Sequence, residues 1–323
     1  MDPAADVAVA GGGVAGSAAA LACVRLGLNT LWFRDAARSG SVWLESLAPE
    51  GGGYLRQLLD REEILIPQRG VFRALETEDR TRVFDPMIGE GIHLIPDLLI
   101  RRLSHNALQR GARDMGPLKT ACREEKDRFE LTEIRKSETF HSRYLIDATG
   151  IRATAARRLG VQRIKIGGER FVARFRGERS MSPNQARFER LKSGGWRFHA
   201  TDARGETTIT QSNAGPAPSE GEQRNMRWQC SARFVCNGLL TAGDCAYRFD
   251  PSCGLGMTRA LKSALLAARA VYQAIRQPQQ AAVSLAHYEQ YMKEDFWDLL
   301  QALSVAQGEP GLVAEYARQS RLP

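Results

Sequence analysis

The chain has 323 residues, of which 43% are hydrophobic and 25% are charged, and its formal net charge is +8 at pH 7. No apolar run approaches the roughly 18 residues of a membrane span, and no basic-then-apolar signal segment opens the chain, so we expect a cytoplasmic protein with no membrane span. The basic residues are dispersed without an aromatic stripe, which argues against a nucleic-acid partner and favours anionic cofactor phosphates and an acidic polypeptide partner or substrate.

The first predicted element is a strand over residues 5–10 that leads into a glycine-rich turn, GGGVAG, at residues 11–16. A small-residue helix over 17–26 follows, Gly27 ends it, and residues 29–33 form a second strand. This is G-x-G-x-x-G in a β-α-β unit, which aims backbone N–H groups and a helix N-terminus at a pyrophosphate. We therefore predict a dinucleotide site, against the alternative of a purely structural turn. Its phosphate-binding residues are Gly11, Gly13, Val14, Ala15 and Gly16.

The end of the second strand departs from the usual dinucleotide pattern. An acid there normally binds the adenosine ribose, but this chain has Arg34, with Asp35 one residue later. Either Asp35 takes the role through a shifted turn, or the adenosine end is held differently. Without a charged acceptor at this position we expect a loosely held dinucleotide, and Arg34→Glu should tighten its binding.

The next elements follow from glycine positions and apolar periodicity. Three glycines at 51–53 predict a flexible segment, and apolar residues at helical spacing predict a helix over 96–110. Alternating patterns predict strands at 129–134 and 139–150. The second of these strands ends at the carboxyl edge of the sheet, where Gly150 would let the backbone approach a cofactor.

Residues 165–235 change character, with alternating strand-like pieces at 170–175, 195–200 and 207–210. We predict an antiparallel sheet inserted into the nucleotide-binding domain, where it covers the reactive end of the cofactor. The fold class is therefore α/β, with a Rossmann-like domain, an antiparallel β insertion and C-terminal helices. The expected divisions are a discontinuous cofactor domain over 1–164 and 236–280, the insertion over 165–235, and a helical segment over 281–323.

A second glycine-rich stretch, residues 242–257, consists of a strand end, an acid, a turn and a glycine-opened helix. A dinucleotide contacted from both ends of a long chain favours FAD over NAD. The alternative is that Asp250, Pro251 and Ser252 merely cap a helix, since Ser or Asp before an apolar run is a common helix start.

The six cysteines are scattered and include no C-x-x-C pair, so we expect neither a metal site nor a disulfide framework. Two of them, Cys245 and Cys253, lie inside the second glycine-rich stretch. We interpret both as small packing residues, with a covalent flavin link or a redox role as the alternative.

Three stretches, in order and across nearly the whole chain, resemble those of the FAD-dependent oxidoreductases that include flavin-dependent halogenases, geranylgeranyl reductase-like enzymes and aromatic hydroxylases. They are residues 11–16, the loop ESLAP at 45–49, similar to that group's G-E-S-L-P-P, and residues 243–256. Likeness around 245–257 narrows the resemblance to flavoproteins that modify tryptophan in a partner polypeptide during tryptophylquinone cofactor biogenesis. The chain departs from the group at Arg34 and at Leu44, which replaces the loop glycine.

The resemblance implies roles for the second glycine-rich stretch. Asp244 would accept hydrogen bonds from the ribityl chain. The turn and helix start that follow would bring backbone N–H groups toward the N1–C2=O edge of the flavin, where a helix dipole stabilises negative charge. The residues that this assigns to the flavin are Pro251, Gly254, Leu255 and Gly256.

Two residues are candidates for catalysis. Glu45 lies, with Ser46, in the loop that the group places beside the isoalloxazine, where a carboxylate in a dry pocket has a raised pKa and can exchange protons. The alternative is that Glu45 organises the loop. His93 either lies near the cofactor or is a surface turn residue.

Three reactions compete. In the first, reduced FAD, supplied with electrons by NAD(P)H or a flavin reductase, takes up O₂ and hydroxylates an aromatic ring through a C4a-hydroperoxide. The favoured ring is a tryptophan of a partner polypeptide. Halogenation is disfavoured because the five tryptophans include no W-x-W-x-I-P signature. A reductase of isoprenoid double bonds is the third reaction, and a non-catalytic protein that binds FAD or a partner is the remaining alternative.

Overall fold

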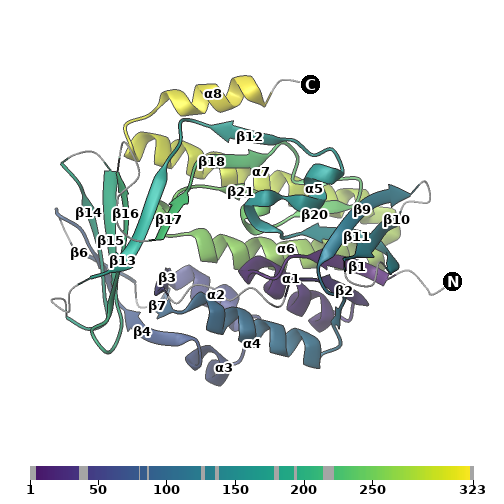
Figure 1. Cartoon of the computed structure of the whole chain (residues 1–323), viewed down its shortest axis with the longest axis horizontal. Coiled ribbons are helices and arrows are strands. Elements are labelled where there is room, and N and C mark those ends of the chain that lie inside the picture. The colour runs from purple at the N-terminus through teal and green to yellow at the C-terminus, as the bar shows by residue number, and fades with distance from the viewer. Residues whose placement is uncertain are drawn as a thin grey trace.

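The computed structural model describes residues 5–35, 43–79, 81–85, 87–124, 128–134, 138–177, 182–192, 195–213 and 222–320. Figure 1 shows the two largest sheets toward opposite ends of the long axis, with helix α6 (Gly256–Arg276) running between them. This arrangement confirms the expected α/β fold with a separate antiparallel sheet.

The larger sheet has eight strands and forms around β1 (Ala5–Ala10), which lies in parallel between β2 (Thr30–Phe33) and β11 (Thr139–Asp147). Helix α1 (Val14–Arg25) connects β1 to β2, and its alanines allow close packing against α6. The strand order is β19-β20-β11-β1-β2-β8, with β10 and β9 continuing from β11. The other elements here are α4 (Pro96–Gln109), β8 (Arg113–Asp114), β9 (Leu118–Glu124), β10 (Arg128–Glu133), α5 (Thr154–Arg158), β19 (Val235–Cys236) and β20 (Leu239–Thr241).

The second sheet has seven strands in the order β17-β13-β16-β15-β14-β5-β6, and every pairing is antiparallel except that of β14 with β5. It stands at the left end of Figure 1, beyond the start of α6. Its strands are β5 (Ala74–Glu76), β6 (Thr81–Val83), β13 (Phe171–Arg176), β14 (Gln185–Arg190), β15 (Gly195–Thr201), β16 (Thr207–Asn213) and β17 (Glu222–Asn225).

The extent of this sheet differs from the expected region 165–235. β5 and β6 come from residues 74–83 and join through the parallel pairing of β5 with β14. β18 (Trp228–Ser231) lies outside the sheet, in a three-stranded sheet with β12 (Arg163–Ile166) and β21 (Tyr247–Arg248). β5 and β6 have only 3 residues each, which is too short for an alternating pattern to be recognised.

The C-terminal segment is helical, as expected, in α7 (Ala281–Ala306) and α8 (Gly311–Gln319). Phe296 of α7 packs against the rings of Tyr247 and Phe249 and against Tyr316 of α8. This aromatic cluster joins both helices to the three-stranded sheet. Within the residues that the structure describes, no helix is long and apolar enough to cross a membrane.

A small antiparallel sheet carries the loop that resembles G-E-S-L-P-P. It consists of β3 (Glu45–Leu47), β7 (Gly91–Leu94) and β4 (Gln68–Phe72), with α2 (Pro49–Arg56) and α3 (Arg61–Leu65) beside it. The glycines at 51–53, expected to be flexible, lie inside α2. A Cβ at Gly51 would clash with Leu47 and lie 2.6 Å from Thr258 Oγ1, so glycine here serves close packing of α2 against α6.

Candidate cofactor and substrate site

The first glycine-rich turn is shaped by backbone contacts between β1 and α1. Gly11 has a φ of 125°, and a Cβ there would clash with the Ala148 carbonyl, while a Cβ at Gly16 would clash with the Gly11 carbonyl. The Trp32 indole N–H donates to the same Gly11 carbonyl at 2.8 Å. Because only glycine fits at these two positions, the turn brings the start of α1 close against the carboxyl end of the sheet.

Among the described residues, nothing blocks the Cβ direction of Gly13 at the start of α1. A Cβ there would have no described neighbour within 4 Å, and α1 has neither a side-chain cap nor an acid in its first turn. The N–H groups of Val14, Ala15 and Gly16 have no acceptor within the helix, and the helix dipole there favours an anion. The residues expected to bind a pyrophosphate therefore surround one electropositive helix end.

Arg34, at the expected ribose position, is already paired. Its Nη2 lies 2.7 Å from Oδ2 of Asp114 on β8, and its guanidinium stacks on the Trp32 ring at 4.4 Å. Sequence reasoning missed Asp114, which is 80 residues away and reaches Arg34 only through the pairing of β2 with β8. Since Arg34→Glu would set two carboxylates against each other, this geometry does not support tighter binding by that variant. A ribose contact by Asp35 stays a prediction.

The second glycine-rich stretch lies directly against the first. Gly243 has a φ of 61°, and a Cβ there would lie 2.7 Å from the Ala15 Cβ, so this contact also requires glycine. Gly150 opens a 3-10 turn that contacts residues 243–245, and its Cβ position has no neighbour within 4 Å. The turns after β11 and β20 and the start of α1 therefore meet at one sheet edge.

Asp244 provides a free acceptor at this edge. Its side chain is partly buried and makes no hydrogen bond or ion pair to any residue that the structure describes. Burial raises the pKa of Asp244, and three arginines oppose the rise, namely Arg259, Arg248 and Arg163. Arg163 also donates to the Asp244 backbone carbonyl at 3.0 Å, which fixes the turn. A fixed carboxylate with free lone pairs suits the hydroxyl groups of a ligand.

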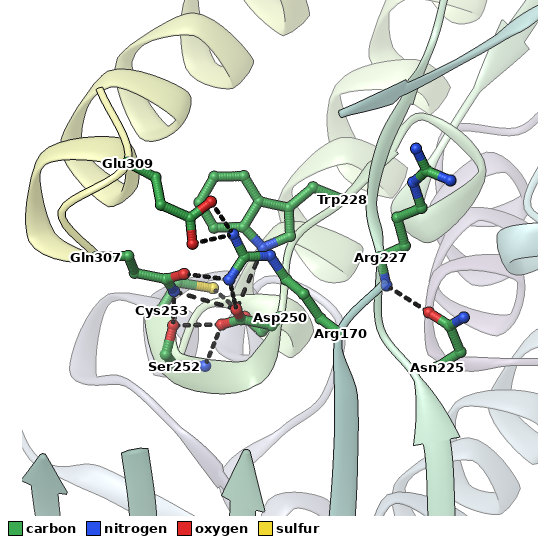
Figure 2. A network of polar contacts seen from close by, with 9 residues as sticks. All are labelled: Arg170, Asn225, Arg227, Trp228, Asp250, Ser252, Cys253, Gln307 and Glu309. Carbon is green, nitrogen blue, oxygen red and sulfur yellow. Dashed lines mark hydrogen bonds and ion pairs between the residues drawn. The ribbon is translucent and has the colours of Figure 1, made fainter. Parts of the chain in front are cut away.

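Asp250 has a structural role, and Figure 2 shows the polar contacts of its carboxylate. Its carboxylate accepts from the Ser252 backbone N–H at 3.0 Å, from the Trp228 indole at 3.2 Å and from the Gln307 amide at 3.1 Å. These bonds cap the 3-10 turn over Pro251–Cys253, and Gln307 ties that turn to the end of α7. The capping alternative thus holds for this turn and not for α6.

The start of α6 repeats the arrangement at α1. Leu255 is its N-cap residue and makes no side-chain cap, and the first turn of α6 contains no acid. The Cβ positions of Gly254, which has a φ of 64°, and of Gly256 have no neighbour within 4 Å. The 3-10 turn before α6 contacts β15, so this second open helix end lies beside the seven-stranded sheet.

None of the six cysteines, all within the described part of the chain, forms a disulfide. Cys245 is fully buried, and Cys253 donates from Sγ to the Asp250 carbonyl at 3.3 Å. Burial raises the pKa of both thiols. Because a protonated thiol is a poor nucleophile, this environment favours packing over a covalent flavin link.

Glu45 joins the loop to the seven-stranded sheet. Its Oε1 lies 2.6 Å from Nη1 of Arg174 on β13. Burial raises the pKa of Asp244, and the negative charge of Glu45 adds to the rise. The two carboxylates are therefore close enough to repel each other. Glu45 therefore stands between the second glycine-rich stretch and the sheet. This position suits proton transfer, and the ion pair with Arg174 suits the loop-organising alternative.

His93 is fully buried in β7, so it is not a surface turn residue. Its Nε2 lies 2.9 Å from the Gln185 carbonyl, which can only accept, so Nε2 carries the proton and Nδ1 accepts from the Ser46 hydroxyl at 2.8 Å. The ring also stacks on Phe72 at 4.5 Å. Burial lowers the pKa of His93 to about 4. With both nitrogens bonded, His93 suits a positioning role better than that of a base.

One face of the seven-stranded sheet is turned toward the loop. Residues paired across antiparallel strands share a face, and Arg174, Thr210 and Phe198 are paired in one row. The Leu44 N–H donates to Thr208 Oγ1 at 3.2 Å, which confirms the direction of that face. It combines hydroxyl groups, guanidinium groups and aromatic rings, from Arg174, Arg176, Phe188, Trp196, Phe198, Thr208, Thr210 and Ser212.

A pocket of about 200 Å³ opens between the loop and this face. Its lining is mixed: Trp43, Leu44 and Ile95 are apolar, whereas the charged part comes from Arg69, Arg176, Asp202, Arg204 and Glu206. A pocket with this lining suits a substrate that has both an aromatic and a polar part. It does not resemble the apolar tunnel that an isoprenoid chain requires.

Comparison with known proteins shows similarity in structure. No protein-family model and no curated relative matches the sequence. The p-nitrophenol 4-monooxygenase PnpA from Pseudomonas putida DLL-E4 has a TM-score of 0.81 at 15% identity, over 99% of this chain and 93% of PnpA. The flavin-dependent halogenase CmlS has a TM-score of 0.75 at 21% identity, over 91% of this chain, which spans only 62% of CmlS. The peptidyl tryptophan dihydroxylase QhpG has a TM-score of 0.71 at 16% identity, over 97% of this chain and 78% of QhpG.

These neighbours include halogenases and aromatic monooxygenases, which is the group that the sequence resembles. The open helix ends, the three glycine contacts and the free Asp244 carboxylate lie where that resemblance placed a dinucleotide. The chain therefore has the fold of the flavin-dependent halogenases and aromatic monooxygenases.

Proposed function

We propose that this chain binds FAD and, supplied with electrons by NAD(P)H or a flavin reductase, hydroxylates an aromatic ring, specifically a tryptophan of a partner polypeptide. The observation that carries the proposal is the pair of uncapped, glycine-opened helix ends at α1 and α6. One anion-binding helix end suits the pyrophosphate, and the other suits negative charge on a reduced ring. Helix α6 also contacts residues 243–245, which lie at the sheet edge where α1 begins.

The residues of this chain divide the task of holding FAD. The N–H groups of Val14, Ala15 and Gly16 would bind the pyrophosphate, and Asp244 would accept from the ribityl hydroxyls. The start of α6 would hold the flavin ring, with no side chain at Gly254 or Gly256 to block its approach. When bound, the reduced flavin would supply the electrons that activate O₂, and O₂ would supply the oxygen atom that is transferred.

The seven-stranded sheet provides the substrate side of the site. Its loop-facing aromatic rings and hydroxyl groups exclude water and orient an indole against the start of α6. Glu45, whose Oε1 lies 2.6 Å from Arg174, provides a carboxylate beside the sheet that would take the proton released from the indole ring. The Ser46 hydroxyl donates its hydrogen bond to His93, so its oxygen lone pairs could accept a hydrogen bond from the ligand.

Tryptophan in a polypeptide is supported by the fold likeness to QhpG, which spans 97% of this chain, and by the motif around residues 245–257. CmlS is a halogenase, but this chain contains no W-x-W-x-I-P signature. Reduction of an isoprenoid double bond is disfavoured because the loop-facing side of the sheet carries Arg174 and a row of hydroxyls.

The test uses the FAD-reconstituted protein with a candidate partner polypeptide, a reductant and ¹⁸O₂. We expect mass spectrometry to find oxygen that carries the heavy isotope on a tryptophan of the partner. Product without isotope from O₂, saturation of an isoprenoid double bond, or a protein that fails to bind FAD in an absorbance titration would each overturn the proposal.

A further inference from the structure

The three-stranded sheet of β12, β18 and β21 has two chemically different faces. Paired residues of an antiparallel sheet share a face, and alternate residues of a strand point to opposite faces. One face carries the apolar members of each strand and packs on the aromatic cluster of α7 and α8. Its residues are Ile164, Ile166, Trp228, Cys230 and Tyr247.

The opposite face is basic. The register places Lys165, Gln229 and Arg248 in one row across the sheet, with Arg163 beside Ser231 in the next. Arg227 directly precedes β18 and continues its alternation, and its carbonyl accepts from Arg248 at 3.2 Å. We call this surface the cationic face and define it as Arg163, Lys165, Arg227, Gln229 and Arg248. It contains four basic residues and no acid.

Within the described ranges of the chain, the cations of this face make no direct ion pair. Arg163 and Arg248 have the Asp244 carboxylate as a neighbouring charge without an ion pair, and the hydrogen bonds of Arg163 and Arg248 go to carbonyls and one hydroxyl. The Nε atoms of the three arginines are buried without an acceptor, and Arg248 is only 6% exposed. Figure 2 shows the Arg227 guanidinium pointing away from the acidic group around Asp250. Burial lowers the pKa of Arg163 and Arg248, and the charge of Asp244 offsets this only in part, so a further anion at this face would be stabilising.

The cationic face leads from solvent to the cofactor site. Lys165 is exposed, Arg227 is half-buried and Arg248 is buried. At the inner end, Arg163 donates to the Asp244 carbonyl at 3.0 Å, so the face adjoins the carboxylate that we assign to the ribityl chain. Because Gln229 and Arg248 are covered by the protein, a ligand would contact Lys165 and Arg227, at the outer end of a face whose inner end adjoins the flavin end of the site.

We propose that the cationic face docks an extended, acidic segment of the polypeptide substrate and so delivers the target side chain to the flavin. This proposal rests on the proposed function and names the chemistry of its substrate. Basic residues at positions 163 and 165 recur every second residue, which is also the spacing of same-side carboxylates in an extended peptide. The face has no glycine-rich turn or helix N-terminus, which a dinucleotide reductant would prefer.

The experiment measures docking separately from oxygen insertion. Fluorescein-labelled tryptophan peptides, identical except for Asp or Asn at alternate positions, are titrated with the FAD-bound protein and followed by anisotropy at low and high salt. We expect the Asp peptide to bind about tenfold or more tightly than the Asn peptide at low salt, and high salt to remove the difference. Arg227→Glu and Lys165→Glu should abolish the preference while FAD affinity is retained.

Arg143→Glu is the matched control, because Arg143 is exposed on β11 and the substitution changes the net charge equally. The proposal is overturned if the two peptides bind alike, if neither binds, or if Arg143→Glu weakens binding as much as Arg227→Glu. A parallel NADPH titration tests the competing ligand. If Arg227→Glu weakens NADPH but not the Asp peptide, the face serves the reductant instead. Failure of hydroxylation with intact peptide docking would count against the proposed function alone.

Discussion

The cofactor side and the substrate side of this site are built by different means. Around α1 and α6 the binding groups belong to the backbone, and glycines leave space for a ligand or allow elements to touch. At the seven-stranded sheet the groups are side chains that reach distant partners, as Glu45 reaches the Arg174 side chain and His93 reaches the Gln185 backbone carbonyl. A backbone site depends on a few consecutive residues, whereas a side-chain site depends on how distant elements pack. We therefore expect the two sides to respond differently to substitution.

The largest effect is expected on the backbone side, from Gly13→Glu. The Cβ position of Gly13 is open and its φ of −84° is ordinary, so the variant should fold. Its carboxylate would occupy the anion position at the start of α1, and we expect FAD affinity to fall by more than about 100-fold. Absorbance titration with FAD measures this, with circular dichroism to confirm folding. Gly13→Gln is the control of equal size, and equal losses in both variants would show that volume rather than charge is responsible.

The same contrast explains what the sequence could predict. The β-α-β unit, the second glycine-rich stretch and the C-terminal helices were predictable because each signal lies within consecutive residues. Asp114 and Arg174 were not, because they lie 80 and 129 residues from their partners. The pairing of β2 with β8 brings Asp114 to Arg34, whereas Arg174 and Glu45 belong to two different sheets that meet only in the folded chain. The buried state of His93 was also hidden, since the β7 sequence contains no sign of the Gln185 carbonyl that it meets. Local sequence signals therefore predicted the residues of the cofactor side, but they did not predict most of the side-chain contacts of the substrate side.

On the substrate side, Glu45→Gln should separate catalysis from cofactor binding. The amide keeps the shape of the side chain and a hydrogen bond to Arg174, but it cannot take a proton. We expect kcat for hydroxylation to fall by about 100-fold, with FAD affinity nearly unchanged. Stopped-flow absorbance and product analysis measure both quantities. Arg174→Gln is the matched variant that removes the other half of the ion pair. If Glu45→Gln retains full turnover while Arg174→Gln loses it, Glu45 only organises the loop.

His93 should make stability depend on pH. Burial lowers its pKa from 6.5 to about 4, so between these values the unfolded chain binds more protons than the folded one. Stability is therefore fully present above pH 6.5 and falls toward pH 4, by as much as about 3 kcal/mol. Urea unfolding across this range measures the slope. We expect His93→Gln to flatten it, whereas His287→Gln, at an exposed position of α7, should leave it unchanged. An equally steep slope in His93→Gln would contradict the assignment.

The smallest effect is expected at Arg34, where a side-chain pair borders the backbone site. Side-chain exposures of 15% for Arg34 and 33% for Asp114 keep the pair partly solvated, and the Trp32 stack adds to it. Arg34→Glu would remove both contacts and oppose two carboxylates, so we expect a loss of stability of about 1 kcal/mol and no gain in FAD affinity. The exchange of charges in Arg34→Asp with Asp114→Arg should recover part of the loss. Urea unfolding and FAD titration test this together. If Arg34→Glu binds FAD more tightly than the wild type, a carboxylate at this position contacts the ribose, and the pair with Asp114 is not what matters for FAD binding.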